Sequence, residues 1–380
     1  MRRGLAVWGA LALAATGARA QEPPAHDYRV WVASEAVDLM QLVRFGPGGL
    51  VVERTHPVGI LPTDPDGPHG VAVAPGGKHV FVSTAHGTPY GSLWKYSALN
   101  DSLEGRVELG LFPATLQVSP DGYLAYVVNF NLHGEMVPSS VSVVATDEML
   151  EITRIPTCVM PHGSRLNAQG TKHYSACMMN DELVEIDTRK LAVSRTFFLR
   201  KGQEHGVIGA MQASAAGPGS PPHDAGGHGM EPPKPGDVSC SPTWAQPTPD
   251  GRRVFVACNK ASEIAEIDAD TWTLTRRLPA GEGVYNLATT HDGRLLVATN
   301  KRGRSVSVFD AATGKELARL PTKRKVVHGV AITPDDRYAF VSVEGIGSEP
   351  GTVEVIDLRA LATVATVDVG PMAGGIDVVP

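Results

Sequence analysis

The sequence predicts an all-β protein: a seven-bladed β-propeller whose N-terminal strands pair with its C-terminal strand to close the ring. Three observations predict this fold: a turn that recurs at the period of one blade, similar short strands around every turn, and two chain ends that each lack a strand partner. Helical periodicity is almost absent from the chain.

The recurring turn resembles Pro-Asp-Gly, and its last residues are spaced 45, 48, 81, 42 and 43 apart. Four of these intervals match the roughly 40–45 residues of one propeller blade, and the fifth equals one blade plus an insertion. The six turns are Pro75-Gly76-Gly77, Pro120-Asp121-Gly122, Ala168-Gln169-Gly170, Pro249-Asp250-Gly251, His291-Asp292-Gly293 and Pro334-Asp335-Asp336.

A β-rich strand follows each turn, as at residues 80–83, 126–129, 254–257 and 339–342. A third strand then ends in an acidic turn, at Asp187, Asp268, Asp310 and Asp357, where the carboxylate can accept hydrogen bonds from nearby backbone amides. The last strand, residues 374–379, has no partner downstream, and residues 28–56 supply three strands without an inner one. Joining them completes the seventh blade and removes the exposed edges.

Tyr126-Val127-Val128-Asn129, followed by a strand ending in Ile-Asp, resembles the YVTN-type propeller repeat. The resemblance covers nearly the whole mature chain and implies the propeller fold. It does not imply a single activity, because that family includes enzymes, binding proteins and surface-layer proteins.

The first 20 residues resemble a secretory signal peptide, with Arg2 and Arg3 before an apolar run and Ala18-Arg19-Ala20 before Gln21. We therefore expect residues 21–380 to form one exported domain, periplasmic or secreted, with no membrane span. Loss of the three signal arginines takes the formal charge from −6 to −9, which disfavours nucleic acid and anionic membranes as partners. The remaining partners are a small-molecule substrate or a periplasmic protein.

Three histidines occupy the same position in three repeats: Pro68-His69-Gly70, Pro161-His162-Gly163 and Val327-His328-Gly329. The position lies at the start of the innermost strand, so blades two, four and seven would each direct an imidazole at the channel. Converging neutral imidazoles suit copper first, with iron or zinc as alternatives. The other interpretation is that a polar channel merely tolerates histidine there. The other copies carry Ala114, Thr243, Tyr285 and Ala373.

Further side chains should reach the same mouth of the channel and contact a substrate or support the metal ligands. The loops between second and third strands supply some of them, and the inner-strand entrances supply Tyr285 and Trp244; ordinary loop chemistry is the alternative. The loop residues are His86, His133, Met178, Met179 and Glu344.

A Gly/Pro/His-rich insertion at about residues 201–237 contains His205, His223, His228 and Met230, which could form an accessory soft-metal loop or a lid. The alternative is a flexible loop without a core. Cys158/Cys177 and Cys240/Cys258 are matched in the two flanking blades, which favours two disulfides within blades over two other pairings or a thiolate ligand.

No serine-hydrolase order, phosphate loop or zinc-protease signature is present. The first hypothesis is a copper-dependent, or iron-dependent, oxidoreductase. Its placement of His69, His162 and His328 is similar to the propellers of nitrous oxide reductase, of the selenium-binding protein/methanethiol oxidase family and of iron-dependent carotenoid-cleaving oxygenases. The chain lacks a seven-histidine ring and an electron-transfer copper domain. The alternative is a non-catalytic binding propeller, a metal carrier or an interaction scaffold; a lactonase is weaker, since its acidic residues are not evident.

Overall fold

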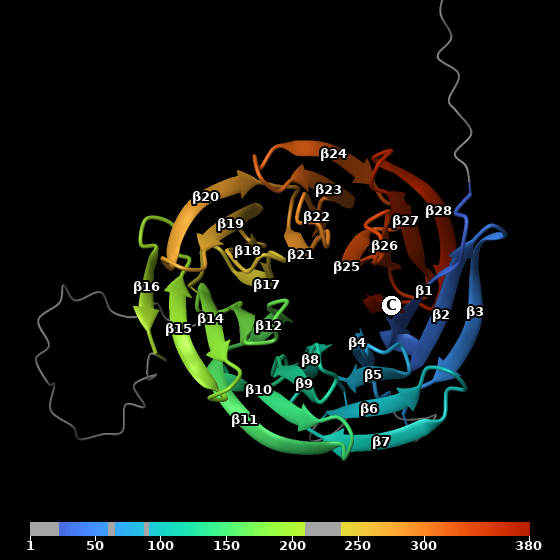
Figure 1. The fold of residues 1–380 in the computed structure, drawn as a ribbon, viewed down its shortest axis with the longest axis horizontal. Helices are drawn as coiled ribbons and strands as arrows, with labels where there is room; N and C mark the ends of the chain where they lie inside the picture. Colours follow the sequence, from blue (N-terminus) through green and yellow to red (C-terminus); the bar gives the residue numbers. More distant parts are fainter. Residues whose placement is uncertain (1–22, 60–64, 87–90, 210–236) are drawn as a thin grey trace, which may run out of the picture.

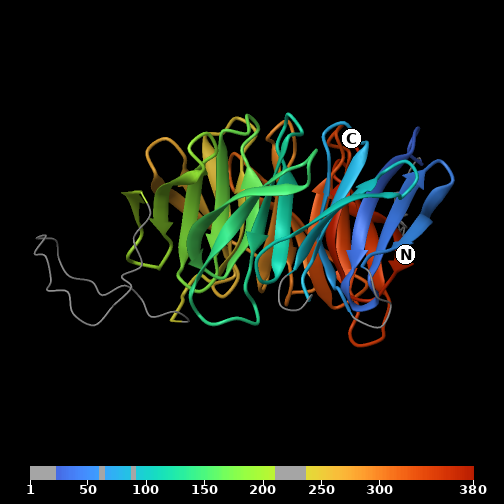
Figure 2. The same cartoon turned by 90° about the horizontal axis from the view of Figure 1, so that it is seen from below.

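The computed structural model describes residues 23–59, 65–86, 91–209 and 237–380. These residues form seven antiparallel sheets arranged as blades around a central axis (Figure 1). Seen edge-on, the ring is a flat disc with its strands running through the thickness (Figure 2). The predicted seven-bladed propeller is confirmed.

Each blade starts at the axis and ends at the rim. Blade 1 contains β29 (Ala373–Val378), β1 (Tyr28–Ser34), β2 (Leu39–Gly46) and β3 (Gly49–Pro57), with the short 3-10 turn η1 (Glu35–Val37) between β1 and β2. Blade 2 contains β4 (Pro68–Val73), β5 (His79–Thr84), β6 (Ser92–Ser97) and β7 (Leu103–Glu108). Blade 3 contains β8 (Pro113–Val118), β9 (Leu124–Asn129), β10 (Pro138–Ala145) and β11 (Leu150–Val159).

Blade 4 contains β12 (Pro161–Leu166), β13 (Lys172–Cys177), β14 (Glu182–Asp187), β15 (Ala192–Phe198) and an extra outer strand, β16 (His205–Ile208). Blade 5 contains β17 (Pro242–Pro247), β18 (Arg253–Cys258), β19 (Glu263–Asp268) and β20 (Thr273–Pro279). Blade 6 contains β21 (Val284–Thr289), β22 (Leu295–Asn300), β23 (Ser305–Asp310) and β24 (Glu316–Pro321). Blade 7 contains β25 (Val326–Ile332), β26 (Tyr338–Glu344), β27 (Gly351–Asp357) and β28 (Ala362–Val369).

The six repeated turns share one backbone conformation. Their last residues, from Gly77 to Asp336, have φ between 57° and 84°, the left-handed region that glycine enters without a steric penalty. Each of these turns joins the inner strand of a blade to the second strand. The turn signal therefore marks the same point in every repeat.

The ring closes where the sequence predicts. β1 pairs with β29 in blade 1, with Val30 opposite Val378 and Val32 opposite Ile376. β29 also packs against β25 on one side and β4 on the other, so the closing strand joins blade 7 to blade 2.

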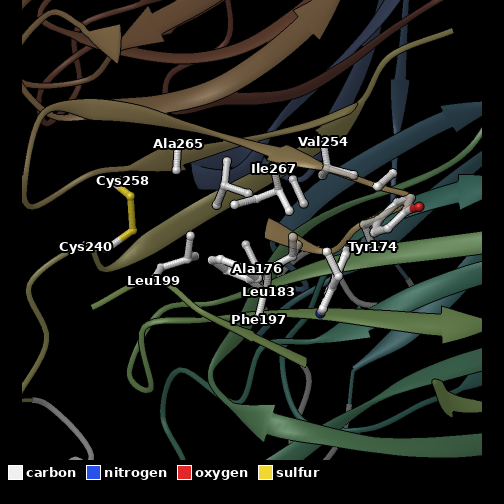
Figure 3. Close-up of a cluster of buried hydrophobic side chains, with 14 residues drawn as sticks. Tyr174, Ala176, Leu183, Phe197, Leu199, Cys240, Val254, Cys258, Ala265 and Ile267 are labelled. Carbon is white, nitrogen blue, oxygen red and sulfur yellow. A yellow bond between two sulfur atoms is a disulfide. The ribbon is translucent and has the colours of Figure 1, made fainter. Parts of the chain in front are cut away.

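The apolar core lies between neighbouring blades. Figure 3 shows one such layer, in which Leu183 and Phe197 of blade 4 face Val254 and Ile267 of blade 5. Each large side chain fully buried in this way stabilises the fold by about 1.5–3 kcal/mol.

The structure bears only in part on the predicted export signal and on the predicted metal-binding insertion. No helix in the described part of the chain is long and apolar enough to cross a membrane. Residues 1–20, and the insertion residues His223, His228 and Met230, lie outside the described residues.

The two predicted cysteine pairings, Cys158–Cys177 and Cys240–Cys258, are confirmed. Their predicted location within single blades is wrong for the first pair, because Cys158 lies on β11 of blade 3 and Cys177 on β13 of blade 4, so that this bridge joins two blades. The thiolate-ligand alternative is therefore wrong, because neither pair leaves a free sulfur. Cys177 lies opposite Pro161 and Cys258 opposite Pro242, so each bridge anchors the chain just before an inner strand.

Replacing either pair with alanines should lower the free energy of unfolding by about 3 kcal/mol, because each bridge reduces the conformational entropy of the unfolded chain. The two losses should be nearly equal, since the bridged residues are 19 and 18 positions apart. Urea denaturation of the two double variants under oxidising conditions measures this. A loss at one pair only would show that the bridges act through local packing instead.

Candidate functional site

All seven inner strands change register near their start, where the repeat places its shared channel position. The shift lies between Pro161 and Ser164 in β12, between Val327 and Val330 in β25, and at matching points in the other blades. A β-bulge re-aims the side chains beside it and is common next to functional sites. The histidine position is therefore a bulge position.

Second-strand hydroxyls fix these bulges and tie neighbouring blades together. Ser83 Oγ accepts a hydrogen bond from the Gly70 N–H and donates to the Ala114 carbonyl of the next blade, both at 2.9 Å. Thr299 Oγ1 accepts from the Asn286 N–H at 3.0 Å and donates to the His328 carbonyl at 2.9 Å. In both examples, a second-strand hydroxyl therefore binds the inner strand of the next blade.

Four inner-strand side chains meet at the axis: His69, His162, His328 and Tyr285. The rings of His69 and His328 have centroids 5.5 Å apart in an edge-to-face arrangement. The Tyr285 hydroxyl lies 2.9 Å from His162 Nε2 and 3.4 Å from His328 Nε2. Tyr285 therefore stands between two of the predicted ligands.

His162 is locked in one orientation. Its Nδ1 lies 2.8 Å from the Thr243 carbonyl, which can only accept, so Nδ1 carries the proton. Its Nε2 must then accept from the Tyr285 hydroxyl. Burial lowers the pKa of His162 to about 3, which keeps the ring neutral.

His328 is oriented by the same hydroxyl. Because Tyr285 donates its only proton to His162, its oxygen can only accept from His328, which places a proton on His328 Nε2. Glu344 Oε1, 3.8 Å from that nitrogen, favours the same tautomer. The lone pair is then on His328 Nδ1, which is buried without a hydrogen-bond partner among the described residues. Burial, followed by the nearby Lys301 charge, lowers the pKa of His328 well below its usual value.

His69 is held by a carboxylate. Its Nδ1 donates to Glu35 Oε2 at 2.8 Å, and Glu35 Oε1 accepts from His86 Nε2 at 2.7 Å. Burial alone would raise the pKa of the Glu35 carboxyl, but its interactions with His69 and His86 hold it well below its usual range. In the neutral tautomer of His69 that donates from Nδ1, Nε2 carries the lone pair, and this nitrogen is buried and unpartnered in the described structure.

These two nitrogens belong to residues that line one axial cavity of about 30 Å³, enough for a few small atoms. Trp244 and Asn286 also line it, and the Trp244 indole N–H and Asn286 Oδ1 have no partner among the described residues. Arg165 completes its polar wall.

The donor set fits a metal through two imidazoles rather than three. His69 and His328 each keep a free lone pair, whereas the His162 lone pair is occupied by Tyr285. In the described residues, no group of three or more His, Cys, Asp or Glu side chains is placed to bind one ion. A three-histidine set would require the Tyr285 hydroxyl to leave His162.

A wider pocket of about 470 Å³ opens beside this layer, lined by Tyr285, Met178 and several cationic side chains. Lys301 Nζ lies 4.3 Å from the Tyr285 ring centroid and 3.3 Å from Glu344 Oε1. The other cationic residues are Arg302, Arg304 and Lys325. We call this the mouth pocket.

The remaining predicted residues have separate surroundings. His133 packs against His86, with ring centroids 5.8 Å apart, and Met179 packs on an apolar cluster beside the mouth. Trp244 lies under the Arg165 guanidinium, 4.4 Å from the ring centroid. His205 lies on β16 at the outer edge of the ring, away from the axis, and stacks on Phe198 (Figure 1).

Sequence reasoning missed Glu35, Lys301 and Arg165. Glu35 and Lys301 lie in loops between the second and third strands of their blades, as His86 does. The repeat alignment could therefore have predicted that both residues reach the mouth of the channel. Arg165 lies on the inner strand three residues after His162, and the repeat alignment has no marker for its direction.

The chain matches no family model, and no curated protein matches it. Among solved structures it is similar to Kuenenia stuttgartiensis hydrazine synthase, with a TM-score of 0.60 and 19% identity over 84% of this chain and 91% of that chain. It is also similar to a functionally unknown protein from Desulfotomaculum acetoxidans DSM 771, with a TM-score of 0.64 and 15% identity over 92% and 98% of the two chains. At these identities the likeness shows the shared fold alone.

Acid should destabilise this protein before most carboxylates titrate. Burial lowers the pKa of both His162 and His173 to about 3, below the roughly 6.5 of an unfolded histidine. Between these values the unfolded chain takes up protons that the folded state refuses, so stability falls as the pH drops, by up to about 1.4 kcal/mol per pH unit for each histidine.

Urea denaturation between pH 7 and pH 4 measures this dependence. His173→Phe should flatten it, because His173 is fully buried, stacks on Tyr126 and has no hydrogen bond to lose in the described structure. An unchanged slope in that variant would contradict the assignment.

Proposed function

We propose that this propeller is an exported metal-binding protein that acts as a copper-dependent oxidoreductase, with the metal held in the axial cavity. One observation supports the proposal above all: His69 Nε2 and His328 Nδ1 are buried, unpartnered in the described structure, and belong to residues lining the same cavity. A buried polar atom without a partner is costly, and a ligand that uses its lone pair removes that cost.

The chemistry of the residues supports a metal in particular. Metal-binding histidines usually donate their second ring nitrogen to a carboxylate or carbonyl, as His69 does to Glu35. Burial keeps His328 neutral, the state in which imidazole coordinates. Imidazole nitrogen suits copper, iron and zinc, and copper remains the first candidate.

The oxidoreductase assignment depends on what surrounds the two imidazoles. Two protein ligands leave positions open, and a bound copper or iron ion would supply one-electron redox chemistry there. Tyr285 lines the mouth pocket and contacts His328, which lines the axial cavity, and the mouth pocket has room for a small-molecule substrate. The similarity in histidine placement to known copper propellers supports the same proposal.

Export is proposed on two grounds. The first 20 residues resemble a signal peptide, and two disulfides are the bonding expected in an oxidising compartment.

Metal analysis of the mature protein tests the central point. Near-stoichiometric copper should be retained by the wild type and by His291→Ala, a control whose side chain is 61% exposed in the turn between β21 and β22. His69→Ala and His328→Ala should lose it, and His162→Ala should lose less, because that lone pair is occupied by Tyr285.

Absence of copper, iron and zinc from the wild type, even after reconstitution, would overturn the proposal. Metal that binds but supports no turnover with any oxidisable substrate would leave the metal-carrier alternative.

Glu35→Gln should weaken metal affinity about 10–100-fold, because the neutral amide no longer polarises His69. Competition with a chromophoric chelator measures this affinity. Glu104→Gln, which removes a carboxylate from the outer-strand ion pair with His79, is the matched control and should leave affinity unchanged. Equal affinities in all three proteins would exclude a role for Glu35 in binding.

A further inference from the structure

Arg165 is a cation at the axis, and no carboxylate of the described residues forms an ion pair with it. Its guanidinium donates to its neighbour, the Ser164 carbonyl, at 2.9 Å and lies over the Trp244 ring, but it forms no ion pair within the described residues. Burial lowers its pKa only to about 10, so it remains charged at neutral pH. Four of its five N–H groups have no protein acceptor among the described residues.

In the described structure the same cavity wall carries one further unused donor, the Trp244 indole N–H, and one unused acceptor, Asn286 Oδ1. Trp244 is 4% exposed, and its indole N–H can only donate, yet it has no acceptor in the described structure. Asn286, also 4% exposed, presents an amide there whose oxygen is unpartnered in the described structure. A half-buried guanidinium beside a buried indole N–H is complementary to an acceptor that carries negative charge.

Protein carboxylates do not fill that role. Asp377 is the acid whose charge acts on Arg165, but its oxygens accept from the Val73 and Val378 backbone N–H groups, and burial raises the pKa of its carboxyl. The two imidazoles that line the cavity, His69 and His328, supply no negative charge. An anion that enters the cavity could therefore act as the counter-ion of Arg165.

The mouth pocket is positively charged, as Arg165 is. Lys301 is partly neutralised by Glu344, and Arg302 by Glu282, but Arg304 and Lys325 form no ion pair in the described part of the chain. A positive mouth raises the local concentration of anions and their rate of arrival.

We infer that the axial cavity binds a small inorganic anion of about one to three heavy atoms, held by Arg165 and Trp244. The cavity of about 30 Å³ excludes a larger carboxylate. Binding of the anion does not depend on a metal. The further step, that a small anion is the substrate class of the oxidoreductase, rests on the proposed function.

The test uses metal-free mature protein, dialysed against EDTA, and titrates it with sodium azide, sodium nitrite and sodium chloride. Sodium gluconate keeps the ionic strength constant and is too large to enter. Tryptophan fluorescence and calorimetry follow binding. We expect saturable binding of at least one of the three anions, weakened at least tenfold in Arg165→Met and in Trp244→Phe.

Arg294→Met, whose side chain is 83% exposed, is the matched control and should bind like the wild type. Arg165→Lys keeps the charge and should retain part of the affinity, which separates loss of charge from loss of folding; circular dichroism checks each variant. Absence of saturable binding by the wild type, or undiminished binding by a folded Arg165→Met, would overturn the inference. Because the protein is metal-free, this result is independent of the metal analysis.

Discussion

Pairing of β1 with β29 is the constraint on which the site depends. It places blade 1 between blades 7 and 2, so that His328 and His69, 259 positions apart in the chain, face each other across β29. β29 has no room for a side chain at Gly375, because a Cβ there would lie 2.3 Å from the His69 carbonyl oxygen. Ring closure and one glycine thus bring the two free imidazole nitrogens to a common cavity.

Tyr285 connects the two pockets near the axis. It lines the mouth pocket with its lysines and arginines, and its hydroxyl contacts His328, which lines the small cavity. The Thr243 carbonyl sets the tautomer of His162, and the Tyr285 hydroxyl passes this constraint on to His328. The lone pairs of His69 and His328 suit a metal cation, and the Arg165 guanidinium suits an anion. The two proposed ligands would therefore use different groups of the cavity.

The repeat alignment reached part of this site and missed the rest for identifiable reasons. It placed His69, His162, His328 and Tyr285 at one channel position because a bulge repeats there in every blade. Glu35 was within its reach, since η1 occupies the same kind of loop as His86. Arg165 was not, because the direction of an inner-strand side chain after a bulge depends on the blades beside it.

The sequence by itself determined the number of blades, the closure and both disulfides, because turn spacing and strand alternation are local properties that repeat. It also predicted one shared channel position for His69, His162, His328 and Tyr285. Only the tertiary structure decided which imidazole nitrogens remain free: His162 is turned to Thr243 and Tyr285, while His69 is turned to Glu35. Those partners come from distant blades, and a ring nitrogen's role is set by the hydrogen bond that the other nitrogen makes.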